Sequence, residues 1–324
     1  MVSVTILDVG HGNCSVVEDD GRPTIIDGGT GPTLLEYLRE EDFQFIDTIL
    51  ISHADCDHIR GLRLALRALP DLIVHTVLVN PSQQKGTHTW GSLVEHLEQR
   101  RERHQTVLGP LLADRLDQVI VGSRTSIEIL SPYYSEVLVP NNVNNTSGVV
   151  RITVDGIGEV LLPADIDDEC LTRLLQRNRP LKSAVVVFPH HGGKAGPNTA
   201  EFARKLTAAV DPKVTVISLG RNSFGNPQPE VVAGVRGSSA DTHICCTQLS
   251  RRCAVALEHA PVHLSQKVSA GRRRGESCGG TVTFLHAGPG IWTVDPPLEA
   301  HSRFVDGVPR PLCRSTDVSA EESG

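Results

Sequence analysis

Apolar runs and stretches of helical periodicity alternate along most of the chain. The runs 48–52, 159–165 and 184–189 consist mainly of Val, Leu and Ile and predict buried strands. Segments 59–69 and 198–209 carry apolar residues at helical spacing and predict helices. Because strands and helices alternate in both halves of the chain, the pattern predicts an α/β layered fold.

Potential metal ligands follow three of these predicted strands. Residues 53–58 read His-Ala-Asp-Cys-Asp-His, the second run ends in Asp165, and the third is followed by His190 and His191. Charge in a strand-to-helix loop such as 53–58 is costly to bury unless a cation compensates it. The sequence therefore predicts a metal site, with a solvated turn as the alternative for residues 53–58 alone.

Several nearby residues are candidates for supporting this site. Adjacent side chains such as His190 and His191 point in different directions, so we expect at most one to bind metal while the other packs or contacts substrate. Asp27 closes a short strand and is a candidate for orienting a ligand histidine by accepting its ring N–H. Asp8, in a glycine-rich turn, is a similar candidate, although a simple hairpin explains that turn equally well.

Length and charge narrow the class of protein. The 324 residues suffice for one large domain or two small ones, and the core must be built from aliphatic residues because aromatics make up 4%. A net charge of −7 argues against a non-specific nucleic-acid coat protein but does not exclude a nuclease. Positive charge is concentrated at 267–275, where Arg272, Arg273 and Arg274 are candidates for phosphate contact and a solvated loop is the other interpretation.

The two ends of the chain and its cysteines bear on location. No basic leader with an apolar stretch opens the sequence, and no segment reaches the roughly 20 apolar residues that span a bilayer, so we expect a cytoplasmic protein without membrane association. The eight cysteines lack a paired CxxC pattern, which favours reduced thiols.

We expect a domain over residues 1–295 and a flexible tail over 296–324, which is rich in Pro, Ser and Glu.

Seven sequence blocks, taken in order, resemble the metallo-β-lactamase fold family and, more narrowly, the hydrolase domain of ComEC-type DNA-uptake proteins. The blocks are DVGHGN, IIDGG, SHADCDHIRG, NNTSGVVRITVDGIGEVLLPADI, FPHHGG, ISLGRNSFGNP and CGGTVTF. The resemblance implies a four-layer αββα sandwich that carries a one- or two-metal site on loops at one edge of its sheets. No membrane-spanning competence region accompanies these blocks, so DNA transport is not implied.

Carried over residue by residue, the resemblance implies a set of metal ligands. These are His53, Asp55, Asp57 and His58 of the ligand loop, Asp165 as the bridging carboxylate and His190 as the closing histidine. Asp55 replaces a histidine of the general fold family and is shared with the ComEC type.

The same resemblance assigns catalytic and substrate-binding residues. Asp57 is expected to be both ligand and proton acceptor, and Asn145 lies in a region where the fold family usually offers a histidine. His191 and Asn226 are expected to contact substrate, and Asn226 stands where ComEC-type proteins tend to carry a histidine.

The function implied is hydrolysis of a phosphodiester, in nucleic acid or a nucleotide, through a hydroxide activated by one or two divalent ions, manganese or zinc. We expect manganese to support activity better, because Asp55 and the asparagines near residue 145 make the site rich in oxygen. Two alternatives are hydrolysis of a lactone or thioester on the same fold, and a non-catalytic interaction subunit whose metal is structural. Six ligand-type residues together count against the second alternative, because a structural site usually closes with four.

Overall fold

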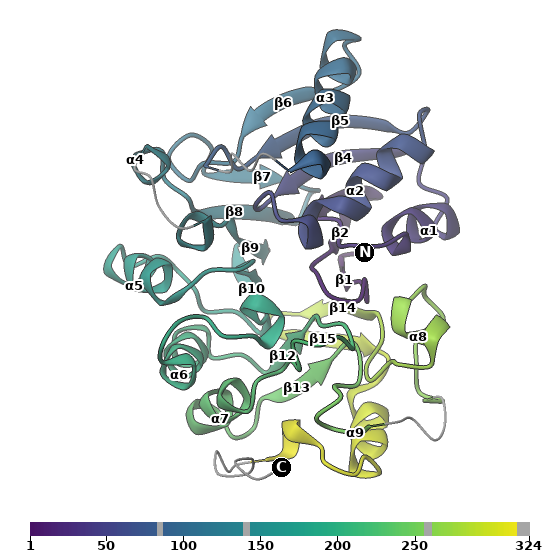
Figure 1. Cartoon of the computed structure of the whole chain (residues 1–324). Helices are drawn as coiled ribbons and strands as arrows, with labels where there is room; N and C mark the ends of the chain where they lie inside the picture. The colour runs from purple at the N-terminus through teal and green to yellow at the C-terminus, as the bar shows by residue number, and fades with distance from the viewer. Residues whose placement is uncertain (83–86, 139–142, 256–260, 316–324) are drawn as a thin grey trace.

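Two β-sheets pack face to face, and helices cover both outer faces (Figure 1). The computed structural model describes residues 1–82, 87–138, 143–255 and 261–315. The layers follow the order αββα, so the predicted four-layer α/β sandwich is confirmed.

The strands of each sheet come from one continuous half of the chain, apart from the C-terminal hairpin. The first sheet contains, in spatial order, β15 (Ile291–Asp295), β14 (Val282–Gly288), β1 (Ser3–Ile6), β2 (Ser15–Asp19), β3 (Arg22–Ile26), β4 (Phe45–Ile51), β5 (Ile73–Val79) and β6 (Val107–Pro110). The second contains β13 (His243–Cys246), β12 (Val214–Ile217), β11 (Val185–Val187), β10 (Ile157–Leu162), β9 (Val149–Val154), β8 (Thr125–Ser131) and β7 (Gln118–Ile120).

Parallel pairing gathers strand ends at one edge of each sheet. Strands β3 to β6 are parallel to one another, and so are β10 to β13. The loops that leave the carboxyl ends of these strands therefore lie together, which is where ligand sites form in sheets of this kind.

Helices occupy both outer layers. The helices of the first half are α1 (Thr33–Glu40), α2 (Cys56–Ala68), α3 (His88–Glu102) and α4 (Tyr134–Val137); those of the second half are α5 (Asp168–Gln176), α6 (Thr199–Val210), α7 (Pro229–Ser238), α8 (Ala270–Arg274) and α9 (Leu298–Asp306). Short 3-10 turns are η1 (Val143–Thr146), η2 (Pro189–Gly192) and η3 (Leu312–Arg314).

Aliphatic side chains fill three apolar layers. Leu50 of β4 and Ile152 of β9 belong to the layer between the two sheets. Helices α1, α2 and α3 bury their leucines on the first sheet, whereas α5, α6, α7 and α9 cover the second. The burial of so much apolar surface, mostly Val, Leu and Ile, is the main stabilising contribution to this arrangement.

Two glycines let helix α2 approach the loop after β3 closely. A Cβ atom at Gly61 would lie 2.0 Å from the carbonyl oxygen of Gly28, and one at Gly28 would lie 2.5 Å from the backbone nitrogen of Leu62. The backbone N–H of Gly28 donates to the carbonyl of His58 at 2.6 Å. Glycine is needed here because any side chain would push the loop away from the helix start.

The C-terminal region differs from the expected flexible tail. Residues 298–306 form α9, in which His301 and Val305 are buried against the second sheet layer. The prolines at 296 and 297 precede the helix, and proline is compatible with a helix start but not with a helix interior. The Pro-rich composition therefore did not indicate the short amphipathic helix that follows. Residues 316–324 of the expected tail lie outside the described residues, as do 140–142 of the expected turn before β9.

Two further expectations concern thiols and membranes. All eight cysteines are free. Within the part of the chain that the structure describes, no helix combines the length and the apolar character needed to cross a bilayer.

Candidate metal centre

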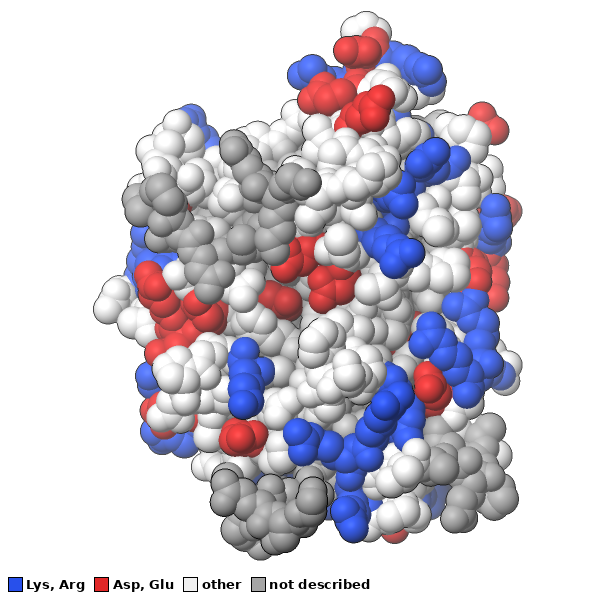
Figure 2. All heavy atoms as spheres, viewed as in Figure 1, with Lys and Arg blue, Asp and Glu red and all other residues white. Residues whose placement is uncertain are grey.

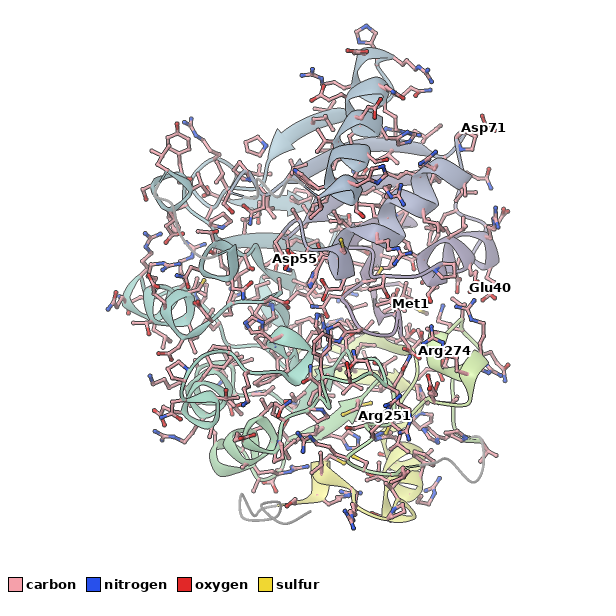
Figure 3. The ribbon with its side chains drawn as sticks, in the orientation of Figure 1. Met1, Glu40, Asp55, Asp71, Arg251 and Arg274 are labelled. Atoms are coloured by element: carbon pink, nitrogen blue, oxygen red, sulfur yellow. The ribbon has the colours of Figure 1, made fainter. Side chains whose placement is uncertain are left out.

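The loop 53–58 places two histidines and two aspartates at the carboxyl end of β4. His53 and His58 are fully buried, while Asp55 and Asp57 are partly exposed. Asp55 takes the extended conformation that begins α2, so the chain turns from strand to helix within this loop. Figure 3 labels Asp55, and Figure 2 shows acidic side chains gathered in the same central region of that face.

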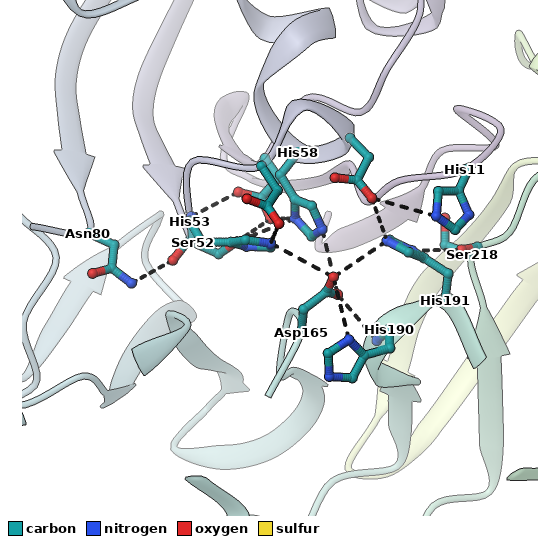
Figure 4. Close-up of polar contacts among 12 residues, drawn as sticks. His11, Ser52, His53, His58, Asn80, Asp165, His190, His191 and Ser218 are labelled. Atoms are coloured by element: carbon teal, nitrogen blue, oxygen red, sulfur yellow. Dashed lines mark hydrogen bonds and ion pairs between the residues drawn. The ribbon is translucent and has the colours of Figure 1, made fainter. Parts of the chain in front are cut away.

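Asp165 lies at the centre of the cluster (Figure 4). Its Oδ1 is 3.6 Å from Nε2 of His58, and its Oδ2 is 3.8 Å from Nε2 of His53 and 3.7 Å from Nε2 of His191. Asp57 approaches the same point, since its Oδ2 is 3.2 Å from Nε2 of His191. The ligand-type atoms of Asp57, His58, Asp165 and His191 all lie within 4.8 Å of one another.

Asp27 and Ser52 fix the orientation of the first two histidines. Oδ2 of Asp27 is 2.7 Å from Nδ1 of His58, and because a carboxylate accepts, Nδ1 carries the proton. The Ser52 hydroxyl donates to the same oxygen at 2.6 Å, so it can only accept from Nδ1 of His53 at 3.0 Å. Both rings therefore turn Nε2 towards Asp165. Asp27, expected to orient a ligand histidine, thus lies within hydrogen-bond distance of His58, whereas no sequence pattern singles out Ser52.

The two adjacent histidines lie in a left-handed turn. His190 and His191 have φ values of 52° and 55°, and Gly192 follows with 73°. This turn sends the two side chains in different directions, as expected. Nδ1 of His191 donates to the carbonyl of Ser218, at the end of β12, at 3.0 Å, which leaves Nε2 facing Asp57 and Asp165. Ser218 is a second supporting residue that the sequence does not mark.

The structure differs from the sequence in which of these histidines joins the compact group. His191, expected to contact substrate, is in that group, whereas Nδ1 of His190, the expected ligand, lies 3.8 Å from Oδ2 of Asp165. The backbone N–H of His190 also donates to Oδ1 of Asp165 at 3.2 Å. Sequence spacing cannot tell which of two adjacent histidines joins the group, because a left-handed turn and an extended strand end would each present a different one.

Electrostatics around Asp165 favour positive charge at this point. Burial disfavours the charged form of His58, but Asp165 and Asp27 outweigh it and hold the pKa of His58 well above its usual value. Burial would raise the pKa of Asp165, yet His191 and His58 lower it well below the usual range. Burial and the neighbouring His58 lower the pKa of His53 to about 4. The carboxylates therefore stay ionised in a buried setting.

These residues fit a divalent cation. Nε2 of His53, His58 and His191 is buried in each case and has no hydrogen-bond partner among the residues that the structure describes, an arrangement that costs free energy unless a ligand satisfies it. Atoms that bind one cation at about 2.0–2.2 Å lie roughly 3–4 Å apart. The separations of 3.2, 3.6 and 3.7 Å around Asp57 and Asp165 match this spacing.

Three other candidate residues are engaged in contacts with the protein itself. Asp8 is buried and accepts hydrogen bonds from Gly10, Gln248, Ser269 and Gly271, but from no histidine of the centre. Nδ2 of Asn145 donates to Glu169 at 2.6 Å, while its Oδ1 is buried and has no hydrogen-bond partner within the described part of the chain. Nδ2 of Asn226 donates to the carbonyl of His190 at 3.3 Å.

The three arginines form a short helix in place of the expected loop. Ser269 caps α8, and Arg272 donates to the carbonyl of Ser265 at 2.8 Å. Arg273 pairs with Glu36 of α1, and Arg274 lies 3.8 Å from Glu276. Figure 3 shows Arg274 well apart from Asp55. These contacts direct the three arginines to α1 and to the residues that flank α8.

His11, from the glycine-rich turn that follows β1, also lies near the centre. Nε2 of His11 is 3.6 Å from Oδ2 of Asp57, and its ring centroid is 4.4 Å from that of His191. Burial, followed by the charge of His191, lowers the pKa of His11 to about 4. His11 therefore lies beside the compact group as a neutral ring.

Comparison with known proteins relates this layered fold and its His/Asp cluster to the metallo-β-lactamase fold. Residues 7–128 match the model of the Metallo-beta-lactamase superfamily. The crystal structure of the metallo-beta-lactamase fold protein YhfI from Bacillus subtilis covers 76% of this chain and 96% of its own, with a TM-score of 0.51 and 12% identity. The chain thus has the metallo-β-lactamase fold.

Two curated relatives are similar to this chain in sequence over most of its length. Recombination protein 2 of Haemophilus influenzae is 26% identical over 229 residues, which are 67% of this chain and 24% of the relative. ComE operon protein 3 of Bacillus subtilis is 23% identical over 253 residues, 71% of this chain and 30% of the relative. The resemblance to ComEC-type proteins is confirmed, and the chain spans only 24% and 30% of the length of these two relatives.

Proposed function

We propose that the chain is a metal-dependent phosphodiesterase or nuclease. The observation that carries the proposal is the convergence of three buried, unpartnered imidazole nitrogens on the carboxylates of Asp57 and Asp165. The similarity to a protein named for recombination supports nucleic acid or a nucleotide as the substrate class.

In this proposal Asp57, His58, Asp165 and His191 hold one divalent ion, and His53, Asp55 and the shared Asp165 hold a second. His190 lies close to Asp165 and is the remaining candidate for the second group. When bound, such ions lower the pKa of a coordinated water and neutralise charge on phosphoryl oxygens. Zinc or manganese would suit the nitrogen and oxygen donors present.

Asp57 is proposed to accept the proton of the attacking water at Oδ2. Burial would raise its pKa, but the close approach of His191 and the charge of His58 lower it below its usual value, so the carboxylate is ionised at neutral pH. Its side chain is 24% exposed, which leaves it accessible to a substrate. Asp27, Ser52 and Ser218 act by holding the ligand histidines in one orientation.

A metal-supplemented assay on single- and double-stranded DNA and RNA tests this proposal. A lactone and thioester panel, run in parallel with bis-p-nitrophenyl phosphate, separates attack on phosphorus from attack on carbonyl carbon. We expect phosphodiester turnover that Asp57→Ala reduces by several powers of ten while the far-UV spectrum is retained. The matched control is Asp71→Ala, because Asp71 is an exposed aspartate that Figure 3 shows far from Asp55.

The other possible outcomes of these assays would support a different function. Turnover of lactones or thioesters without phosphodiester cleavage would assign a carbonyl hydrolase. Tight metal binding with no turnover of any substrate would assign a non-catalytic subunit. Wild-type rates in Asp57→Ala would remove Asp57 from the proton-transfer step.

A further inference from the structure

An exposed phenyl ring lies beside the metal centre. Phe224, between β12 and α7, is 62% exposed. Its ring centroid is 4.9 Å from that of His11, and the two planes are tilted by 30°. The His11 ring in turn is 4.4 Å from that of His191. Two ring-to-ring steps therefore lead from the surface to a residue of the compact metal-binding group.

The exposure of Phe224 is not the result of a loosely held loop. The backbone N–H of Phe224 donates to Oδ1 of Asn222 at 3.0 Å, and Gln228 donates to the carbonyl of Phe224 at 3.0 Å. Nε of Arg252 donates to the carbonyl of Gly225 at 2.7 Å. These bonds fix the backbone on both sides of the ring, which packs against His11 with a tilt of 30° and stays largely exposed to solvent.

The surroundings combine this aromatic surface with positive charge. Arg251 is exposed and precedes Arg252, the residue that holds the Phe224 loop. An aromatic ring, a cation and a site suited to a phosphoryl group together match the three parts of a nucleotide that proteins recognise: base, backbone charge and scissile phosphate.

We propose that Phe224 and His11 form a stacking platform for an unpaired nucleobase of the substrate, next to the metal centre. The proposal rests on the proposed phosphodiesterase function and narrows its substrate to single-stranded nucleic acid. Duplex bases are already stacked on their neighbours and present no free face, whereas single strands stack on protein aromatics with little dependence on sequence.

The test uses the metal-loaded full chain and three variants of one position. Phe224→Ala removes the ring, Phe224→Leu keeps apolar bulk without aromaticity, and Phe224→Trp restores a stacking surface. Ile291→Ala is the control, because Ile291 is 59% exposed and lies on β15, in the C-terminal hairpin. The substrates are a single-stranded oligonucleotide in deoxyribo and ribo forms, its duplex, and a strand of the same length made of abasic residues.

We expect Phe224→Ala and Phe224→Leu to raise KM for the single strand by about 10- to 100-fold, which is the range for loss of one stacked base. Phe224→Trp and Ile291→Ala should stay near wild type. Cleavage of the abasic strand should be the same in all variants, because it offers no base to stack.

A binding measurement separates this inference from the proposed function. A single strand carrying 2-aminopurine should lose fluorescence on binding to wild type and to Phe224→Trp but not to Phe224→Ala. Quenching without any cleavage would contradict the proposed function and support the platform. Cleavage with equal KM for base-containing and abasic strands, and quenching unchanged in Phe224→Ala, would overturn the platform and leave the phosphodiesterase intact.

Discussion

Nδ1 of His58 and Oδ2 of Asp27 lie 2.7 Å apart, across a contact that two glycines make possible. Asp27 leaves β3 with a positive φ of 58°, and its other oxygen accepts the backbone N–H of Ser52 at 2.8 Å. One buried carboxylate thus joins the ends of β3 and β4 and sets the orientation of a histidine that belongs to the compact group.

We predict that Asp27→Asn weakens metal binding by about 10- to 100-fold, the usual effect of removing a residue that orients a ligand histidine. The amide can no longer accept at both positions that face Ser52 and His58. Competition with a chromophoric chelator measures the affinity, and Asp71→Asn is the surface control. An unchanged affinity would show that the orientation of His58 does not depend on Asp27.

The two adjacent histidines should differ in their effect on metal content. His191→Ala is predicted to lower the number of bound ions per chain more than His190→Ala, since Nε2 of His191 approaches both Asp57 and Asp165 and its ring is fixed by Ser218. Metal analysis of the two variants after dialysis against the same buffer provides the measurement. The opposite order would return the ligand role to His190.

Metal preference should depend on residue 55. The three residues His53, Asp55 and Asp165 offer two carboxylates and one imidazole, whereas the group around His191 offers two of each, and oxygen donors favour harder ions. We predict that metal-stripped protein regains more activity with Mn²⁺ than with Zn²⁺, and that Asp55→His shifts the optimum towards zinc. Full recovery with stoichiometric zinc, or the same preference in Asp55→His, would contradict this prediction.

The arginines of α8 are predicted to contribute modestly to binding of a long polyanion. The sequence suggested three phosphate contacts, but Arg272 and Arg273 already bind a carbonyl and Glu36, whereas the side chain of Arg274 is 64% exposed and lies 3.8 Å from Glu276. Replacing all three by glutamine should reduce the slope of log affinity against log salt by about one, not three. Turnover of a small phosphodiester should not change. A decrease of about three in this slope would instead indicate that all three arginines contact phosphate.

A histidine outside the metal centre should make the fold sensitive to acid. His301 is 1% exposed, with Nδ1 2.9 Å from Nε2 of His243 and Nε2 3.3 Å from Sγ of Cys278. Burial first, then the charges of His243, His263 and Arg314, lower the pKa of His301 to about 3.

The unfolded chain, in which a histidine titrates near about 6.5, therefore binds the proton more readily than the folded chain. The free energy of unfolding should fall as pH decreases from about 6.5 towards about 3. His301→Gln should flatten this dependence in urea unfolding between neutral pH and pH ~5, whereas His75→Gln, an exposed control, should not. Parallel curves for His301→Gln and wild type would contradict the assignment.

The layered fold could be predicted because apolar runs mark its strands directly. Leu50, Leu161 and Val186 belong to runs with few polar interruptions, and such runs occur where both faces of a strand are covered. The site residues at the ends of these runs, His53 and Asp165, could be found for the same reason.

The details of the site needed the three-dimensional structure. Which of His190 and His191 approaches Asp57 as well as Asp165 depends on a left-handed turn that no spacing rule anticipates. Ser52 and Ser218 act through a hydroxyl and a carbonyl, groups that occur throughout any chain. Helix α9 was not predicted, because a segment rich in Pro, Ser and Glu is usually disordered.

The buried carboxylate of Asp8 has a consequence for dissecting this protein. Three of its donors, Gln248, Ser269 and Gly271, come from more than two hundred residues further along the chain. A recombinant fragment ending before residue 248 would lack these three donors. The carboxylate would then remain buried with only the N–H of Gly10 left of the four donors described above. The residues matched by the superfamily model, 7–128, are therefore not expected to form an autonomous folding unit, and domain boundaries for expression should include the C-terminal strands.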